Sequence, residues 1–321
     1  MIADNNWYDE MWMPITGSTG AWPNSFGQNY CNRFKGDARF NMTSQHILMV
    51  NKNLFILEKP FPSSSRNHFI DSPVGDKLTF HKYRMSTITE RYKTGRTLYT
   101  NPCSEMFDDN IPDTWIKTVF EACVNNPQHN YVFVTTNVGR LVEFQKTYPD
   151  LITENMWFGI SINESIYKHL PAFERNIRSF NGPAHLFLYF DVPSLWNGAF
   201  LESLLFDVAD KFSWVLVNFK WGYSKEIYSQ FDNFTKEFKI PLYIERSDVA
   251  TFRRETPKEF SRVVYAAGRK KIRVAKCGGC KGEYEKKSMH TIGSYVKRGD
   301  GYKVVGWLCD KCYEEFKKQF E

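Results

Sequence analysis

A regular alternation of β-type and helical sequence patterns runs through the middle of the chain, from residue 97 to residue 244. Short runs of β-branched and aromatic residues are each followed by a stretch with apolar residues at helical spacing, such as Trp115, Val119, Phe120 and Cys123. Alternation of this kind produces parallel strands joined by crossover helices, in an open doubly wound sheet or in a complete or partial barrel. The pattern predicts an α/β fold with strands over 97–100, 131–135, 157–162, 185–190, 214–219 and 242–244, and helices over 113–125, 139–146, 164–179, 200–212 and 224–238.

Polar side chains follow these strands, and in parallel α/β folds catalysis and ligand binding gather at the carboxyl ends of the strands. Residues of this kind also cap helices, which is their commoner role at any single position. For acid–base chemistry the strongest candidates are Glu105, Asp191 and Lys220, with Glu164 as a further carboxylate, although no spacing among them fixes a reaction. The full set is Asn101, Cys103, Ser104, Glu105, Thr136, Asn137, Ser161, Asn163, Glu164, Asp191, Asn218, Lys220, Glu245 and Arg246.

Four cysteines near the C-terminal end form two CxxC pairs, which are separated by 28 residues rich in β-type and turn residues. Two such pairs supply four thiolates to one tetrahedral Zn²⁺ and leave no open position, so the predicted site is structural. Redox dithiols are the weaker alternative, because a redox CxxC opens a helix in a thioredoxin-like context. A module this small needs the metal in order to fold. The predicted ligands of this zinc ribbon, over 276–321, are Cys277, Cys280, Cys309 and Cys312.

Positive charge is concentrated next to this module. Residues 253–321 hold 18 Lys and Arg against 9 Asp and Glu, whereas the whole chain holds 42 against 36. A basic segment of this kind is typical of a polyanion partner, DNA or RNA, although a protein partner or a merely solubilising surface also fits. We expect a barrel over 1–250, a basic helix and linker over 251–275, and nucleic-acid contacts from Arg253, Arg254, Arg262, Arg269, Lys270, Lys271 and Arg273.

The first eight residues are polar and acidic, and no run of about 18 apolar residues occurs in the chain. We therefore expect neither a secretory signal nor a membrane partner, and we expect a cytoplasmic location. In that reducing compartment, paired cysteines hold metal more often than they form disulfides.

The N-terminal string Trp12-Met-Pro-Ile-Thr-Gly-Ser-Thr19, followed by Tyr30-Cys-Asn-Arg-Phe34, resembles the opening of a phage- and prophage-associated family related to radical-SAM enzymes, the three-Cys-motif family. That family begins Trp-Asn-Pro-X-Thr-Gly-Cys-Thr and continues through Cys-X-X-Cys-Tyr-Ala. The resemblance covers roughly residues 12 to 245, with low identity between landmarks. Its further landmarks, in order, are 100–107, 127–129, 133–137, 155–161 and 214–217.

This resemblance implies a partial barrel of radical-SAM type, in the cytoplasm of a bacteriophage host if the chain is phage-encoded. The family's first two cluster cysteines fall on Ser18 and Ser25, and Cys31 is the only thiol nearby. Because a [4Fe–4S] cluster needs cysteine thiolates, we expect this loop to be degenerate and to hold no cluster. A rescue by Cys31, Cys103 and Cys123 is disfavoured, since Cys123 falls on a helix and buried cysteines usually act as small apolar residues.

Three functions are compatible with these features. The first is a descendant of radical-SAM-type proteins without radical chemistry, acting as a zinc-containing, nucleic-acid-associated or regulatory subunit. The second is a non-radical enzyme that modifies a nucleotide or nucleic acid at the barrel mouth. The third is a protein–protein adaptor in a larger assembly.

Overall fold

The structure is a computed structural model, and it describes most of the chain between residues 77 and 260 together with shorter pieces at both ends. The described residues are 7–17, 47–59, 77–91, 94–102, 104–162, 166, 169–191, 208–219, 225–245, 252–258, 260, 274–276, 283–285, 290–295, 302–308 and 311. The chain divides into two compact units, 1–267 and 268–321. Each unit is described by itself.

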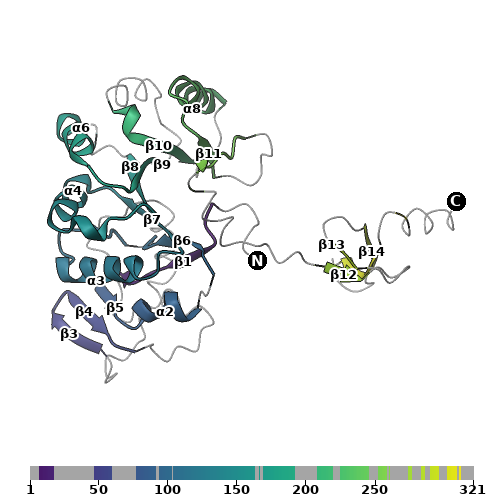
Figure 1. Cartoon of the computed structure of the whole chain (residues 1–321), viewed down its shortest axis with the longest axis horizontal. Coiled ribbons are helices and arrows are strands. Elements are labelled where there is room, and N and C mark those ends of the chain that lie inside the picture. The colour runs from purple at the N-terminus through teal and green to yellow at the C-terminus, as the bar shows by residue number, and fades with distance from the viewer. Residues whose placement is uncertain are drawn as a thin grey trace. The chain divides into compact units, whose positions relative to one another are not determined.

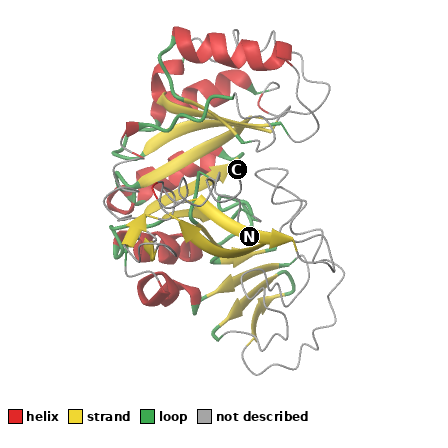
Figure 2. Cartoon of the chain, turned by 90° about the vertical axis from the view of Figure 1, so that its right-hand side faces the viewer, coloured by secondary structure: helices red, strands yellow, loops and turns green. Residues whose placement is uncertain are grey.

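A parallel sheet of seven strands forms the centre of the first unit and curls into a half-barrel (Figures 1 and 2). Every neighbouring pair of its strands is parallel, which confirms the predicted α/β fold and partial barrel. In spatial order the strands are β1 (Glu10–Trp12), β6 (Thr97–Thr100), β7 (Asn130–Thr135), β8 (Met156–Ile162), β9 (His185–Asp191), β10 (Phe212–Asn218) and β11 (Leu242–Ile244).

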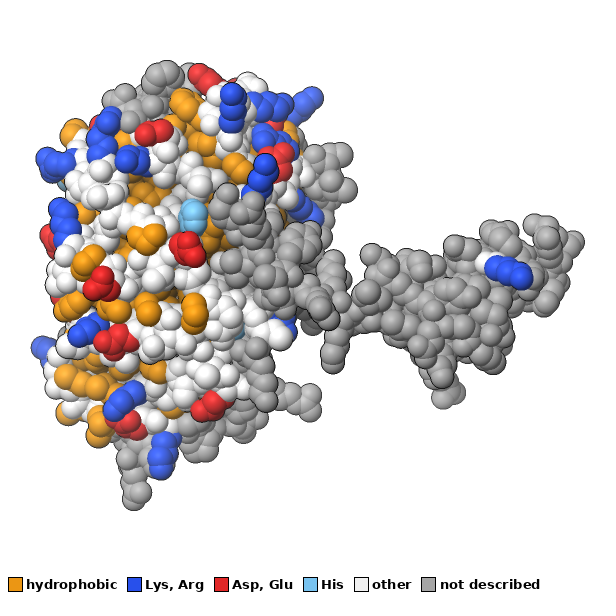
Figure 3. Space-filling view, in the orientation of Figure 1, with side chains coloured by type: hydrophobic (Ala, Val, Ile, Leu, Met, Phe, Trp, Pro, Cys, Tyr) orange, Lys and Arg blue, Asp and Glu red, His pale blue; other side chains and the backbone are white. Residues whose placement is uncertain are grey.

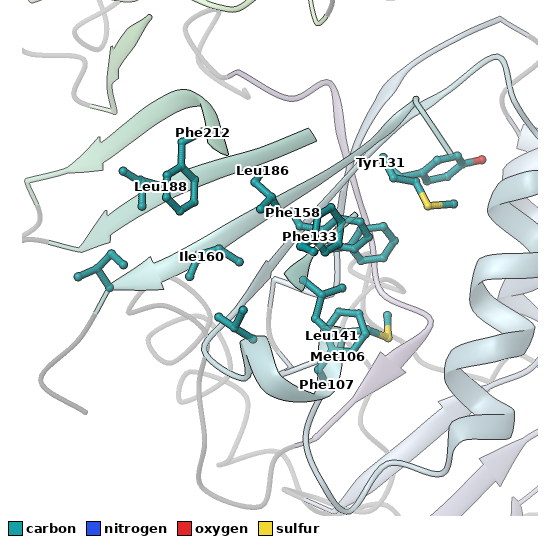
Figure 4. Close-up of a cluster of buried hydrophobic side chains, with 14 of the residues drawn as sticks. Met106, Phe107, Tyr131, Phe133, Leu141, Phe158, Ile160, Leu186, Leu188 and Phe212 are labelled. Carbon is teal, nitrogen blue, oxygen red and sulfur yellow. The ribbon is translucent and has the colours of Figure 1, made fainter. Parts of the chain in front are cut away.

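Helices α3 (Asp113–Val124), α4 (Val138–Thr147), α6 (Leu170–Ser179) and α8 (Lys225–Glu237) lie on the outer face of this sheet (Figure 1). Between helices and sheet lies the larger of two buried apolar clusters, part of which is drawn in Figure 4. Its centre is a stack of rings: Phe133 lies 4.9 Å from Phe120 and 5.4 Å from Phe158. Burial on the outer face holds the crossover helices in place.

Two predicted helices have different bounds in the structure. The segment predicted as 164–179 is interrupted at His169, whose φ of −126° is not helical, and α6 begins at Leu170 with Pro171 in its first turn. Proline has no N–H and disfavours a helical residue before it, so a helix readily restarts at this position. For the segment predicted as 200–212, residues 200–207 lie outside the described part; Ala209–Lys211 form one 3₁₀ turn, and Phe212 begins β10.

A second, four-stranded sheet packs beside the half-barrel and was not predicted. Its order is β2 (Ile15–Thr16), β5 (Leu78–His81), β4 (Leu54–Leu57) and β3 (Ile47–Asn51), and α2 (Arg84–Arg91) follows β5. Arg84 joins it to the main sheet: its guanidinium donates to Met13 O at 2.5 Å, and its own carbonyl accepts from Trp12 Nε1 at 3.1 Å. The predicted loop insertion at 61–74 lies outside the described residues.

Residues 252–256, here called the strap, run antiparallel along β11. Ile244 N donates to Arg253 O at 3.0 Å, and Glu255 N donates to Leu242 O at 2.9 Å. Arg253 also pairs with Asp232 on α8 at 2.9 Å. The strap thus covers the edge of the sheet that β11 would otherwise expose.

In the second unit, β12 (Val274–Lys276) pairs antiparallel with β13 (Glu283–Glu285), and β14 (His290–Tyr295) pairs antiparallel with β15 (Tyr302–Leu308). No helix in the described part of the chain is long and apolar enough to cross a membrane.

Candidate functional site at the mouth of the half-barrel

The inner face of the half-barrel carries a buried aromatic layer. Trp214 lies at its centre, with the Phe260 ring at 5.0 Å and the Trp7 ring at 6.0 Å, and Trp7 in turn lies 4.8 Å from Tyr99. Side chains alternate along a strand, so this cluster is separate from the one beneath the helices. Its buried members are Trp7, Tyr99, Val132, Val134, Trp157, Phe187, Tyr189, Trp214, Leu216, Tyr243 and Phe260.

Gly159 makes room within this layer. A Cβ atom at this position of β8 would lie 2.3 Å from Cζ of Phe187 on the neighbouring strand, far inside van der Waals contact. Glycine therefore allows the Phe187 ring to lie across β8. The lower part of the half-barrel is consequently filled by protein side chains.

Above the aromatic layer, three polar residues lie side by side at the carboxyl ends of β9, β10 and β11. Asp191 is paired with Asn218 in the strand register, and Glu245 N continues the register by donating to Val217 O at 2.8 Å. Neighbouring strands are about 4.8 Å apart, so the three side chains form a short row. We call Asp191, Asn218 and Glu245 the polar row. Each keeps part of its surface exposed, whereas Tyr189, in the layer below, is buried.

The electrostatics of the polar row set Glu245 apart. Desolvation by the surrounding protein raises the pKa of Glu245 to about 7, the negative charge of Asp191 adds to this, and the Trp7 side chain opposes it. Burial, with the charges of Glu245, Tyr99 and Asp191, raises the pKa of Tyr189 well above its ordinary value, while a hydrogen bond from Asn218 acts in the opposite direction. One carboxyl group of the row is thus poised to gain or lose a proton near neutral pH.

Glu105, a predicted catalytic residue, lies elsewhere. It follows β6, three strand positions from Asp191 on β9. Its Oε1 accepts from Phe107 N at 3.1 Å, and its Oε2 accepts from Thr136 N at 2.8 Å and from Thr136 Oγ1 at 3.0 Å. Burial raises the pKa of Glu105, and these hydrogen bonds oppose the rise. Glu105 therefore links the loop after β6 to the loop after β7, and it is not part of the polar row.

Of the remaining predicted residues, Asp191 belongs to the polar row, and Arg253 is engaged with Asp232 and Glu255 in the strap. Arg254 forms a bridge with Tyr243 of β11. Cys123 is fully buried on α3, and burial raises the pKa of its thiol well above the ordinary value, so it is an unreactive core residue. Outside the described residues lie Lys220, Glu164, Ser18, Ser25, Cys31, Cys103, Arg262, Arg269, Lys270, Lys271, Arg273, Cys277, Cys280, Cys309 and Cys312.

From the sequence, Glu245 is a polar residue at a strand end and is not distinguished as a catalytic candidate. The missing signal was the register of β9, β10 and β11, which only the folded sheet supplies. Among the residues that the structure describes, no three His, Cys, Asp or Glu side chains are grouped so as to hold a metal ion. On the face shown in Figure 3, acidic and basic side chains of the first unit are interspersed.

Comparison with known proteins gives one result. A family model described as a protein of unknown function, DUF5131, matches residues 3–178, which is over half of the chain. The match ends before Asp191 and so does not include the polar row. No curated protein and no solved structure matches the chain.

Proposed function

The chain belongs to DUF5131, a family of proteins of unknown function, and from this starting point we propose that its half-barrel is a non-radical enzyme that performs acid–base chemistry at the polar row. The observation that carries the proposal is the Glu245 carboxyl, whose pKa is raised to about 7 beside Asp191. At neutral pH such a group is present in both protonation states, which suits a general acid or base. Perturbed carboxyl pairs at strand ends are typical of active sites.

Each residue of the row has a role in this proposal. Glu245 exchanges a proton with the substrate; burial keeps the pKa of Glu245 high, and the negative charge of Asp191 adds a smaller rise. Asn218, which hydrogen-bonds Tyr189, fixes the tyrosine below the carboxylates. The proposed substrate class is a nucleotide or nucleic acid, which is supported by the excess of Lys and Arg in residues 253–321.

The proposal is tested with Glu245→Gln and Asp191→Asn, with Glu154→Gln as a control because Glu154 is exposed at the opposite end of β8. Nucleosides, nucleotides and short oligonucleotides are screened at pH 7 by thermal shift and then for turnover by mass spectrometry. We expect turnover with an apparent pKa near 7, lost in Glu245→Gln and shifted to lower pH in Asp191→Asn. Turnover that survives both substitutions would refute the proposal.

A second readout does not need the substrate. The folded-state pKa of Glu245 is above its ordinary value of 4.5, so its contribution to stability is full below pH 4.5 and falls as pH rises through about 7. Glu245→Gln removes this loss. In urea unfolding at pH 8, the variant should be more stable than wild type by up to about 3 kcal/mol, since one pKa unit corresponds to about 1.4 kcal/mol. If the difference in unfolding free energy between Glu245→Gln and wild type were the same at pH 5 and at pH 8, the pKa of Glu245 would not be raised in the folded protein.

The lineage is a separate part of the proposal. We infer that the half-barrel descends from radical-SAM-type proteins and has lost its [4Fe–4S] site, on the strength of the motif at 12–19 and the serines at Ser18 and Ser25. The curled parallel sheet of seven strands is compatible with that origin.

The second unit has its own proposed function, which rests on the strands around its cysteines. Cys277 and Cys280 fall in sequence between the paired strands β12 and β13, and Cys309 directly follows β15. A CxxC in the turn of a β-hairpin is the arrangement of a zinc ribbon. We propose that the unit binds a structural Zn²⁺. We also propose that the basic segment before it in the sequence, residues 251–275, contacts nucleic acid or else a protein partner.

A further inference from the structure

A cavity of about 480 Å³ lies beyond the carboxyl ends of β6 and β7, next to α4 and α6. Its walls are the loop after β6, the start of α4 and one side of α6. This volume is in the range of small-molecule sites. The cavity contains none of the three residues of the polar row, so it is a separate feature of the fold.

The polar wall of this cavity is acidic. Glu105, Asp108 and Asp109 line it, and no Lys or Arg is among its described lining residues. The nearest guanidinium of α4, that of Arg140, is directed instead at Ile111 O and at Asp113, 2.8 Å away. A ligand that brings positive charge is therefore the one that this wall favours.

The lining also has an apolar part. Val138, Ile166, Ala172 and Phe173 supply it, from α4 and from the α6 side, and the other lining side chains, apart from the acidic ones, are neutral polar groups and His169. Gly139 lets α4 lie close to Asn176 of α6: a Cβ atom there would come within 3.3 Å of Asn176 Nδ2. The cavity thus combines acidic and apolar lining residues, which suits a ligand with both an alkyl body and a cationic end.

A bare metal ion fits this arrangement less well. The Glu105 carboxylate oxygens accept hydrogen bonds from Phe107 and Thr136, and Asp109 Oδ1 accepts from Asn137 Nδ2 at 2.9 Å. Asp108 Oδ1 accepts from Asn110 N at 2.8 Å. Hard cations need several oxygens converging at 2.0–2.6 Å, whereas an ammonium group donates to oxygens that already accept other bonds.

We propose that this cavity binds an organic amine with an aliphatic chain, of the polyamine class. The ammonium groups lie against Asp108 and Asp109, and the methylene chain lies against Phe173 and Ala172. Binding here is independent of proton transfer at the polar row.

The test is isothermal titration of the full-length protein with spermidine, putrescine and MgCl₂ at low salt and pH 7.5. We expect spermidine to bind more tightly than putrescine, and Mg²⁺ to compete only weakly. Asp109→Asn keeps the acceptor for Asn137 and should weaken spermidine binding up to about tenfold, since it removes one of the acidic charges that line the cavity. Asp150→Asn, an exposed acid after the far end of α4, is the matched control and should bind like wild type.

A second variant tests the contribution of the cavity's space separately from that of its charges. Ala172→Phe fills the space beside Phe173 and keeps every carboxylate, so it should abolish binding while thermal unfolding shows that the protein is folded. Glu245→Gln should bind spermidine normally, which makes failure here distinguishable from failure of the proposed enzyme function. Equal loss of binding in Asp109→Asn and Asp150→Asn, Mg²⁺ binding as tight as spermidine binding, or full binding in Ala172→Phe would each overturn the proposal.

Discussion

His81 is one of the residues that link the N-terminal motif to the rest of the first unit. It is fully buried on β5, and its Nε2 lies 2.7 Å from Thr16 Oγ1 on β2. Burial, with a smaller effect of the Arg84 charge, lowers the pKa of His81 well below its ordinary value of 6.5. The imidazole is therefore neutral in the folded protein and joins the two strands without charge.

We predict that this histidine makes stability depend on pH on the acid side of neutrality. Its folded-state pKa is depressed, so the unfolded chain takes up the proton first, and stability that is complete above pH 6.5 is lost as pH falls below that value. Because Glu245 changes stability in the opposite direction over the same pH range, the comparison is made in the Glu245→Gln background, where urea unfolding at pH 7.5 and 5.5 should show a loss of at least about 1 kcal/mol. His81→Gln should reduce this loss, whereas replacement of the exposed His169 by Gln should leave it unchanged. An equal loss with and without His81→Gln in the Glu245→Gln background would contradict the assignment.

At the scale of elements, the basic residue Arg253 has a structural role in the strap. Arg253 NH1 lies 2.9 Å from Asp232 and 3.0 Å from Thr235 Oγ1, and its NH2 lies 2.6 Å from Glu255. These contacts hold the strap to α8 while its backbone pairs with β11. Charge count in the sequence grouped Arg253 with residues expected to contact nucleic acid, because sequence does not show which guanidinium is already occupied.

We predict that Arg253→Ala destabilises the first unit by about 1–3 kcal/mol, because a partly buried charge pair loses one partner. The backbone amides of Ile244 and Glu255, which donate across the strap, should also exchange with deuterium faster. Lys258→Ala removes an exposed charge nearby and should change neither quantity. If Arg253→Ala weakened nucleic-acid binding with stability and exchange unchanged, the residue would be a binding group instead of a strap anchor.

The strands and sheets also differ in how well the sequence predicts them. Strands β6 to β11 are predicted well because buried parallel strands are continuous apolar runs, such as Trp157 to Ile162. The small N-terminal sheet is missed because β2 has only two residues and is held by distant partners, among them Asn101 Oδ1, which accepts from Ile15 N at 3.1 Å. The polar row depends on register between strands far apart in sequence, so the sequence places Asp191, Asn218 and Glu245 at strand ends but singles out only Asp191 of the three as a catalytic candidate.

At the scale of the whole molecule, two compact units share one chain. We predict that the full-length protein carries about one Zn²⁺ per chain, the stoichiometry of four cysteine ligands. A Cys277→Ser, Cys309→Ser double variant should lose the metal, and calorimetry should then show the transition of the second unit lost and that of the first unit kept. Cys123→Ser, a buried cysteine of the first unit, is the control and should keep its zinc. Retention of zinc in the double variant would refute the proposal that these cysteines form a zinc ribbon.

The positions of Asp191, Asn218 and Glu245 make the chemistry of this half-barrel separable from its scaffold. Each lies at a strand terminus with part of its surface in solvent, and the packed layer under it consists of other residues, such as Tyr189 and Leu216. Exchanging the functional group at these three positions alters reactivity with little effect on packing, whereas a change at Gly159 or Phe187 disturbs the floor itself. The side chains of the proposed site can therefore change while the framework stays the same, and an engineer can redesign the mouth without rebuilding the barrel.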